Sequence, residues 1–505
     1  MFADLAGHIA LGLETAFSWT NLFYCFVGVF LGMLVGVIPG IGSLAAISML
    51  LPITFHLEPT AAIIMLAGVF YGTSYGGSTA SILLNLPGTP SSAVACVDGY
   101  PMSKQGRGGI ALMMTTVGSF IAGSIGIVIM MLASPIIVEY ALKFGPSEYF
   151  ALMVLGLIAA SAITTTAPIK GIAMVVFGLL LGCVGSDLET GVARFAFDIP
   201  ELYDGIQLTV IAMGLFGVSE VVASIEGIRG ARVDAKSITL RSMIPTSDDW
   251  RRSWMPILRG TLGGSFFGAL PGTGGVIASF MAYALEKKIS KEPERFGHGA
   301  IEGVVAPESA NNAADQTAFI PTLTLGIPGN VIMALMIGAL TIHGIVPGPQ
   351  FMVQHPDMFW GLVMSFWIGN LILVILNIPL IGLWIRVLAV PYHLMYPAII
   401  MFVCMGVYSV NNSHFDVIMV MIVGALGYSM RYLDLPAAPL ILGFVLGPLM
   451  EENLRRALLI GRGDFAVLFN RPISGTIMAM AIALLLWAIY ENYRPTKGRL
   501  VDADD

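Results

Sequence analysis

Two segments of this chain carry the same skeleton of glycine and proline. The first reads Gly28-x3-Gly32-x3-Gly36-x2-Pro39-Gly40-x-Gly42, and the second reads Gly260-x3-Gly264-x3-Gly268-x2-Pro271-Gly272-x-Gly274, at an offset of 232 residues. Glycines four residues apart share one helix face and let a second helix approach closely. The Pro-Gly pair removes a backbone donor and permits a positive φ, so each segment is predicted to be a helix that breaks.

The composition places both predicted breaks inside a membrane. Of the 505 residues, 56% are hydrophobic and 11% are charged, and the mean hydropathy is +0.83. Soluble domains carry about 25% charged residues. Apolar runs of roughly 17–25 residues recur along the chain, and they are too long for barrel strands. We therefore predict an all-α polytopic membrane protein with about 12 transmembrane helices.

Several other classes of protein are disfavoured by the same sequence. The net charge of −7 comes without a basic patch interleaved with aromatic residues, so no nucleic-acid partner is expected. No Gly-Lys dipeptide occurs, so the chain lacks a Walker A loop. The seven histidines are isolated and the four cysteines are scattered, so no structural metal site is predicted. The N-terminus has no basic region typical of a cleaved signal peptide.

Basic residues are distributed unevenly between the two broken segments. No Lys or Arg precedes Lys104, whereas Arg and Lys flank the second break on both sides, from Arg251 to Arg295. Cytoplasmic loops collect Lys and Arg, so the first motif is predicted to open outward and the second toward the cytoplasm. Matching segments of opposite orientation are typical of an inverted repeat in secondary transporters.

The predicted organisation follows from this repeat. Residues 1–225 form the first repeat, 226–253 a cytoplasmic linker, 254–490 the second repeat and 491–505 a polar tail. Each repeat contains a broken-helix transport motif followed by scaffold helices: 20–108 then 109–225, and 254–350 then 358–490. The two transport motifs are expected to move together against the scaffold. Whether each break makes a re-entrant hairpin or two short crossings is left open.

Polar residues at matching places in the two motifs form the predicted site. Buried hydroxyls and amides in lipid usually face a cavity or a neighbouring helix. The predicted substrate-binding residues are Ser43, Ser74, Ser78, Asn85, Gly88, Thr89, Thr273, Asn311, Asn312, Thr324, Gly329 and Asn330. Carbonyls freed at the breaks and two acids are predicted to handle a coupling cation, through Gly40, Gly272, Glu308 and Asp315.

Three alternatives to a secondary transporter stay open: an intramembrane protease, a passive channel or facilitator, and a non-transporting assembly subunit. Ser74 lies in a G-x-S-x-G pattern typical of serine hydrolases. Asp464 lies in a GxGD pattern, with Tyr203-Asp204 elsewhere, which resembles intramembrane aspartyl proteases. The glycine-rich membrane surroundings of Ser74 and the arginines around Asp464 argue against proteolysis. A passive anion channel or facilitator could be built from the same broken helices.

The motifs together resemble the TctA family, the large membrane subunit of tripartite tricarboxylate transporters. The resemblance covers nearly the whole chain and rests on Gly36-Val-Ile-Pro-Gly-Ile-Gly42, Tyr71-Gly-Thr-Ser-Tyr-Gly-Gly-Ser78, Asn85-Leu-Pro-Gly-Thr-Pro90, Gly268-Ala-Leu-Pro-Gly-Thr-Gly-Gly275, Pro307-Glu-Ser-Ala-Asn-Asn-Ala-Ala314 and Leu325-Gly-Ile-Pro-Gly329. It implies a multi-pass protein of the bacterial inner membrane with a small TctB-type membrane subunit and a periplasmic TctC-type binding protein. It also implies uptake of citrate or a similar carboxylate, coupled to Na⁺ or H⁺, with no cofactor.

Overall fold

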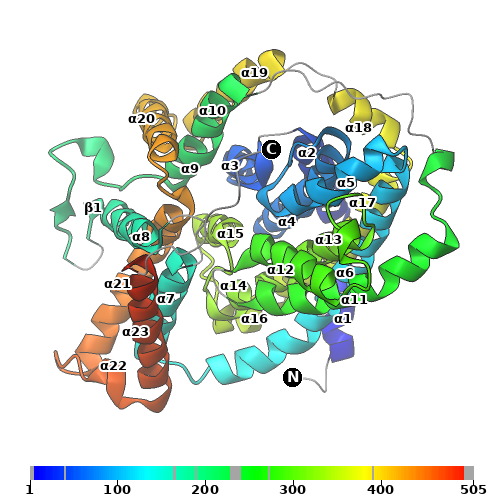
Figure 1. The fold of residues 1–505 in the computed structure, drawn as a ribbon. Helices are drawn as coiled ribbons and strands as arrows, with labels where there is room; N and C mark the ends of the chain where they lie inside the picture. Colours follow the sequence, from blue (N-terminus) through cyan, green and yellow to red (C-terminus); the bar gives the residue numbers. More distant parts are fainter. Residues whose placement is uncertain are drawn as a thin grey trace. The chain divides into compact units, whose positions relative to one another are not determined.

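The chain is helical almost throughout the part that the structure, a computed structural model, describes. That part comprises residues 5–38, 41–162, 167–187, 190–227, 240–270, 273–388 and 392–493. The two-residue strands β1 (Gly185–Ser186) and β2 (Ala193–Arg194) pair antiparallel. Five described helices are long and apolar enough to cross a membrane: α2 (Trp19–Val37), α6 (Gly108–Ala141), α17 (Pro356–Asn377), α20 (His414–Tyr432) and α23 (Pro472–Tyr493). The predicted all-α polytopic membrane fold is confirmed (Figure 1).

Other helices, several of them as long as these five, make up most of the rest of the described fold. Apolar ones include α3 (Gly42–Thr54), α7 (Pro146–Ala162), α8 (Pro168–Gly182) and α15 (Val331–Ile342). The others are α1 (Leu5–Ala16), α4 (Pro59–Leu84), the 3₁₀ turn η2 (Pro90–Ser92), α5 (Ala93–Lys104), α9 (Leu208–Ala212), α10 (Ser219–Gly227), α11 (Ser247–Ala269), α12 (Gly274–Ile289), α13 (Glu302–Thr317), α14 (Phe319–Leu325), α16 (Pro349–Gln354), α18 (Ile381–Leu388), α19 (Tyr392–Asn411), α21 (Ala437–Ile460) and α22 (Val467–Asn470). The count of about 12 crossings stays a prediction.

The chain divides into two compact units, each built from two separate stretches of the sequence. Unit 1 comprises Met1–Lys143 and Val184–Met430, and unit 2 comprises Phe144–Cys183 and Arg431–Asp505. In unit 2, α8 and α21 pack closely through Gly178 and Gly443, where a Cβ would overlap the facing backbone. Arg471 there binds the buried carboxylate of Glu148 at 3.0 Å. Both predicted transport motifs lie in unit 1.

Glycine brings α2 and α4 into backbone contact within the first motif. A Cβ on Gly28, Gly32 or Gly36 would overlap backbone atoms of Met65, Val69 and Thr73, in that order. Residue numbers increase in the same direction along both helices from one contact to the next, so α2 and α4 run parallel. The helix α3 between them must therefore carry the chain back. Its 13 residues reach about 20 Å, less than the roughly 30 Å hydrocarbon core.

The second motif repeats this arrangement with α11, α12 and α13. A Cβ on Gly260, Gly264 or Gly268 would overlap the backbone of alanines on α13, at positions 306, 310 and 314. Here too the pairs ascend together, so α11 and α13 are parallel and α12 runs back. The 16 residues of α12 reach about 24 Å. The geometry at both breaks therefore favours a helical hairpin.

Local backbone geometry also repeats on either side of the breaks. The C-cap residue of α2, Ile38, has φ −83° and ψ 113°, and the C-cap residue of α11, Leu270, has φ −87° and ψ 128°. α3 and α12 both begin at a glycine in the left-handed region, with φ +68° at Gly42 and +61° at Gly274. The broken helices predicted from the glycine–proline skeleton are thus observed. The Pro-Gly pairs themselves, including Gly40 and Gly272, lie outside the described residues, and their cation-coupling role stays a prediction.

Two helix boundaries differ from what hydropathy suggests. The polar stretch Tyr71–Thr79 does not separate two apolar runs but continues α4, because its hydroxyls face protein rather than lipid. The helix α11 begins at Ser247, inside the stretch predicted as linker. Thr246 caps its start and forms a capping box with Asp249, which lets a polar first turn remain helical.

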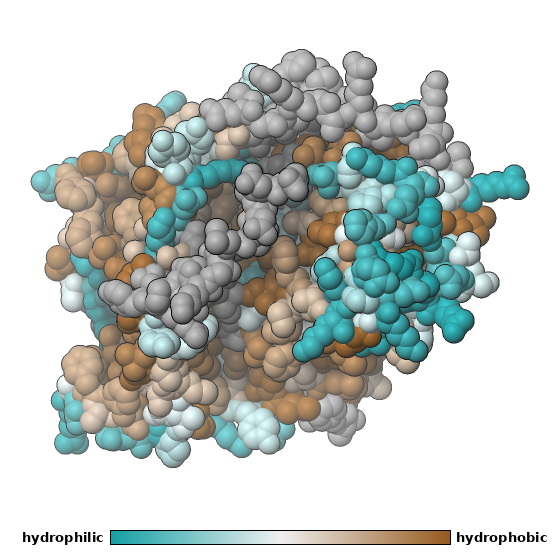
Figure 2. All heavy atoms as spheres, viewed as in Figure 1, coloured by the Kyte–Doolittle hydropathy of each residue, from teal (hydrophilic) through white to brown (hydrophobic). Residues whose placement is uncertain are grey.

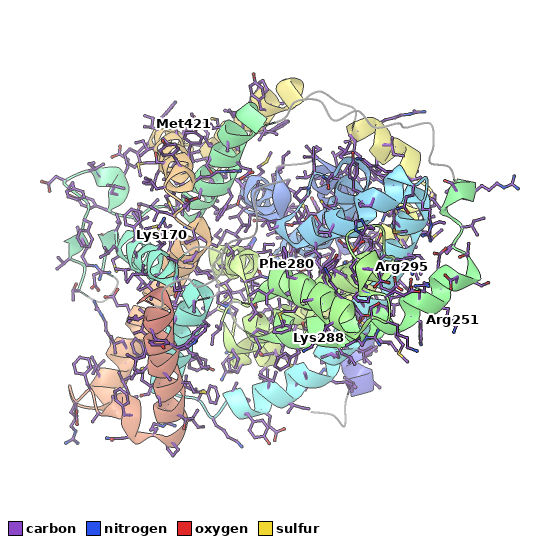
Figure 3. All side chains as sticks on the ribbon, viewed as in Figure 1. Lys170, Arg251, Phe280, Lys288, Arg295 and Met421 are labelled. Atoms are coloured by element: carbon purple, nitrogen blue, oxygen red, sulfur yellow. The ribbon has the colours of Figure 1, made fainter. Side chains whose placement is uncertain are left out.

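The surface of unit 1 separates into apolar helix faces and one charged end. On α11 and α12, Leu262 and Phe280 are more than half exposed, as lipid-facing residues would be. Figure 2 shows hydrophilic residues gathered over α5 and the nearby ends of α11–α13. Figure 3 places Arg251, Lys288 and Arg295 around these same helices. The basic residues used for the orientation prediction thus cluster in space.

The close contact of α11 with α13 makes a testable prediction about two adjacent glycines. Gly264→Ala should destabilise the protein by about 1–3 kcal/mol, because its Cβ would overlap the Ala310 backbone. Gly263→Ala is the matched control, since nothing lies within 4 Å of its added Cβ. That control should gain about 0.5–1 kcal/mol from helix propensity. Thermal midpoints of the detergent-solubilised variants measure both effects, and equal midpoints would contradict the packing.

Candidate functional site

A buried polar contact joins the two motifs where α4 meets α13. Ser74 Oγ donates to Asp315 Oδ2 at 2.6 Å, and Ser78 Oγ donates to Glu308 Oε2. All four residues are at most 4% exposed. The later serine on α4, Ser78, contacts the earlier acid on α13, Glu308. The two helices therefore run in opposite directions where they touch.

The two acids lack a basic partner in the part of the chain that the structure describes. Neither Glu308 nor Asp315 takes part in an ion pair there, and the hydroxyls of Ser74 and Ser78 are the groups that donate to them. Burying an ionised carboxylate without compensation costs several kcal/mol. Such a group is stable only when a proton or a bound cation neutralises it. The pair is therefore a candidate cation or proton site.

The start of α12 faces this acidic pair. A Cβ on Gly275 would overlap Asn311 Oδ1 and would lie 3.3 Å from Asp315 Oδ1. The first turn of a helix presents free N–H groups and a partial positive charge. Asn311 is 1% exposed, and its Nδ2 has no hydrogen-bond partner among the described residues. A donor left unpaired in this way is available to an anionic or carbonyl ligand.

Helix starts also meet in pairs within each motif. A Cβ on Gly42, at the start of α3, would lie 3.9 Å from Gly88 O, just before η2 and α5. A Cβ on Gly274, at the start of α12, would lie 3.2 Å from the Cβ of Asn330, which caps α15. Two positive helix ends thus converge in each motif, which suits an anion.

Other predicted site residues have local bonding partners. Ser43 accepts from Thr73 Oγ1 at 2.6 Å, Thr273 donates to Leu270 O at 3.0 Å, and Asn330 Oδ1 accepts from Met333 N–H at 2.9 Å. Thr324 Oγ1 donates to Ile320 O in its own helix at 2.6 Å. These bonds leave the hydroxyls of Thr273 and Thr324 committed to backbone carbonyls. Their substrate-binding role stays a prediction.

The remaining predicted residues lie around the cluster or away from it. Asn312 Nδ2 donates to Ser119 Oγ of α6 at 2.8 Å and to Glu308 O, one turn earlier, at 3.0 Å. Thr89 forms a capping box with Ser92 at η2. Asn85 is exposed and ends α4 in the left-handed conformation with φ 59°. Gly88 and Gly329 are buried at the loops before η2 and α15. The structure therefore gathers Ser74, Ser78, Glu308, Asn311 and Asp315 into one cluster.

Some buried polar groups near the cluster are absent from the sequence-based site. Tyr71 OH, Thr79 Oγ1 and Gln316 Oε1 are buried without a hydrogen-bond partner among the described residues. Such groups are rare in native proteins. Tyr71 and Thr79 belong to the same polar run as Ser74, and Gln316 follows Asp315, so sequence proximity is the signal that could have identified them. No group of three or more His, Cys, Asp and Glu residues in the described ranges is arranged to hold a metal.

A separate cleft of about 310 Å³ lies between the ends of α11, α12 and α13. Most of its charged side chains pair with one another. Arg259 binds Glu286 through two bonds of 2.6 and 2.7 Å, and Arg252 binds Glu292 at 3.0 Å and Glu302 at 3.1 Å. This ion-pair network joins the arms of the α11–α12 hairpin at the end opposite the break. We interpret it as a structural staple.

The protease-like pattern around Ser74 lies in the middle of α4. A nucleophile elbow requires a sharp strand-to-helix turn that exposes the serine oxygen. Here the hydroxyl is buried and donates to Asp315. The local geometry of this serine therefore differs from that of a nucleophile elbow.

Comparison with known proteins is consistent across nearly the full length. Residues 22–442 match the family model described as "Tripartite tricarboxylate transporter TctA family". The chain is 48% identical over 502 residues to the "Uncharacterized 52.8 kDa protein in TAR-I ttuC' 3'region" of Agrobacterium vitis, covering 99% of this chain and all of that protein. It is 51% identical over 242 residues to the "Uncharacterized protein in TAR-II ttuC' 3'region" of the same organism, covering 48% of this chain and all of that protein. No solved structure matches.

The bond from Ser78 to Glu308 generates a prediction about stability. Ser78→Ala should destabilise the protein by about 1–3 kcal/mol, because a buried carboxyl group loses its donor. In a Glu308→Gln background the same change should cost less, and the difference measures the coupling between the two side chains. Ser409→Ala is the control, since among the described residues that exposed hydroxyl bonds only to Gly406 O of its own helix. If Ser78→Ala and Ser409→Ala have the same thermal midpoint, the contact contributes nothing.

Proposed function

Because this chain belongs to the tripartite tricarboxylate transporter TctA family, we propose that it is the translocating subunit of a secondary transporter that imports citrate-like di- and tricarboxylates. The family is one of transporters rather than enzymes, and the chain is a multi-pass membrane protein. The observation that carries the proposal is the pair of buried acids that have no basic partner among the described residues, where a helix of one motif meets a helix of the other.

An inverted repeat is supported by the contact between Ser74 and Asp315. Their offset of 241 residues equals that between Leu86-Pro-Gly88 and Ile327-Pro-Gly329, so they occupy equivalent positions. Equivalent residues touch when they lie near a two-fold axis. The contacts between motifs are reciprocal as well: α12 packs on η2, and α3 packs on α15. With α4 and α13 antiparallel, this pattern fits two motifs inserted in opposite directions.

The converging helix starts supply the proposed carboxylate site. Free N–H groups at the starts of α3 and α12, which have no side-chain cap, would bind substrate oxygens, as at other helix N-termini. The orphan amide of Asn311 adds a side-chain donor. Because the central cluster is at most 4% exposed, we interpret this arrangement as an occluded one. Substrate access then requires movement of surrounding helices.

Coupling is assigned to Glu308 and Asp315. A coupling cation, Na⁺ or H⁺, would neutralise these acids and make their burial tolerable. Carboxylate and hydroxyl oxygens are hard ligands that suit a small cation. In this scheme the cation binds between the serines of the first motif and the acids of the second. Loading of the cation would lower the cost of closing the site around an anionic substrate.

The surroundings of the transporter are proposed from the family and from the charged end. A small TctB-type membrane subunit would accompany the chain, and a periplasmic TctC-type protein would deliver substrate. Arg251, Lys288 and Arg295 gather around the ends of α11–α13, which we assign to the cytoplasmic face of the bacterial inner membrane.

Uptake by the reconstituted complex tests this function. Vesicles should accumulate a labelled citrate-like carboxylate against its gradient when a Na⁺ or H⁺ gradient is imposed. Glu308→Gln and Asp315→Asn should each lower uptake at least about tenfold, as loss of a cation ligand or its partner does. Asp357→Asn removes an exposed acid and serves as the control. Gradient-independent equilibration would indicate a passive facilitator, and normal coupling in both acid variants would remove the acids from the mechanism.

A further inference from the structure

Asp98 on α5 makes a second buried contact between the two motifs. Its side chain is fully buried. One oxygen, Oδ1, accepts backbone N–H bonds from Gly297, Gly299 and Ala300 at 2.8, 2.9 and 2.8 Å. The other oxygen, Oδ2, accepts from Tyr283 Oη at 3.0 Å. Asp98 belongs to the first motif, and all four donors belong to the second.

The segment that receives Asp98 is shaped for a carboxylate. Gly297 and Gly299 adopt φ of +92° and +99°, which turns nearby N–H groups toward one point. Such concave groups of backbone N–H donors bind anions. A Cβ on Gly303 would overlap Asp98 Oδ2, so a glycine is needed there for the approach. The nest between α12 and α13 is therefore filled by a side chain of this protein.

A second bond reinforces the attachment close by. Gln105 Nε2, just after α5, donates to the carbonyl oxygen of His298 at 2.9 Å. His298 lies within the segment that surrounds Asp98. The two attachments are seven positions apart in the first motif but converge on one short segment of the second. Two linked surfaces held in this way cannot slide past each other without breaking several bonds at once.

The contact of Asp98 with the second motif is costly to break because it consists of hydrogen bonds to a buried carboxylate. Hydrogen bonds to an ionised carboxylate are roughly twice as strong as neutral ones. Breaking them in a dry site would leave a charge and several donors unsatisfied. The Ser74–Asp315 contact is different, because a cation or proton can compensate for its loss. Asp98 has four protein donors and needs no such ligand.

We propose that Asp98 fastens the first motif to the second, so that residues 20–108 and 254–350 move as one body during transport. This inference rests on the proposed function and assigns to Asp98 a positioning role rather than contact with substrate. The helices that change position would then be those outside the two motifs.

Cross-linking tests whether the fastened surfaces separate. Gln105→Cys and His298→Cys are introduced after Cys25, Cys96, Cys183 and Cys404 have been replaced, and the pair is joined with a short bis-methanethiosulfonate reagent. The cross-linked complex should retain uptake within about twofold of the untreated one, because the two positions do not move apart. A loss of about tenfold that a reductant reverses would overturn the proposal, since a block on alternating access stops transport.

Rescue distinguishes fastening from a general need for Asp98 in folding. Asp98→Ala should lower uptake at least about tenfold, and the same cross-link should restore most of it, because a covalent bond replaces the lost hydrogen bonds. Asp98→Asn keeps the shape but loses the charge, and it replaces Asp98→Ala if the alanine variant does not fold. Tyr283→Phe removes one donor of four and should have a small effect. Failure of the cross-link to restore uptake would overturn the inference.

The two proposals fail in different ways. If the unmodified complex shows no gradient-driven uptake, the proposed function is wrong, and this result says nothing about Asp98. If the unmodified complex transports normally while cross-linking stops it, the function stands and the fastening is wrong.

Discussion

Close backbone contact between helices is the constraint on which the two motifs depend. Apolar side chains gain little by packing together in lipid, because lipid tails are as apolar as they are. Helices in a membrane associate instead through dispersion and interhelical polar bonds at short range. The glycines of α2 and α11 provide that short range, since Gly32 and Gly264 touch the backbones of Val69 and Ala310. Because glycine leaves one face of α2 and of α11 without side chains, α4 and α13 pack close against these helices inside unit 1.

The burial of α4 and α13 inside unit 1 determines which partners their polar side chains can find. Their backbone groups are satisfied within each helix, so the hydroxyls and acids are the groups that still need partners. Ser74 and Ser78 find Asp315 and Glu308, while the charge of the two acids stays uncompensated by any basic group in the described ranges. Replacing the two acids with apolar residues of the same size would lower the desolvation cost of burial. Retaining acids at such a site is understandable when their neutralisation is part of the function.

The sequence predicted the features that depend on neighbouring residues. Glycines four apart and the Pro-Gly pairs act within one turn of helix, so the interruption between Ile38 and Gly42 could be placed correctly. Glu308 and Ser78 could be named as candidates because both belong to polar runs. Their pairing could not be predicted, since it joins residues 230 positions apart through the packing of two motifs.

Local competition for hydrogen bonds explains other differences between sequence and structure. Thr324 looks like a ligand in the sequence, but its hydroxyl donates to the carbonyl of Ile320 one turn earlier. Asp98 shows the opposite case. It is a single acid on a short helix, and its partners depend on the backbone conformations of Gly297 and Gly299, which the sequence of α5 does not reveal.

At the equivalent positions where the two motifs touch, one motif carries a hydroxyl and the other carries an acid. Ser74 and Asp315 occupy equivalent positions and touch, so identical residues there would meet themselves. Two acids about 4 Å apart would repel by about 4 kcal/mol at an effective dielectric constant of 20. Two serines would leave no charge for a cation. A hydroxyl in one motif and an acid in the other avoids the repulsion and retains the charge. A two-fold axis through a dry site therefore favours a repeat that is symmetric in backbone and asymmetric in charge.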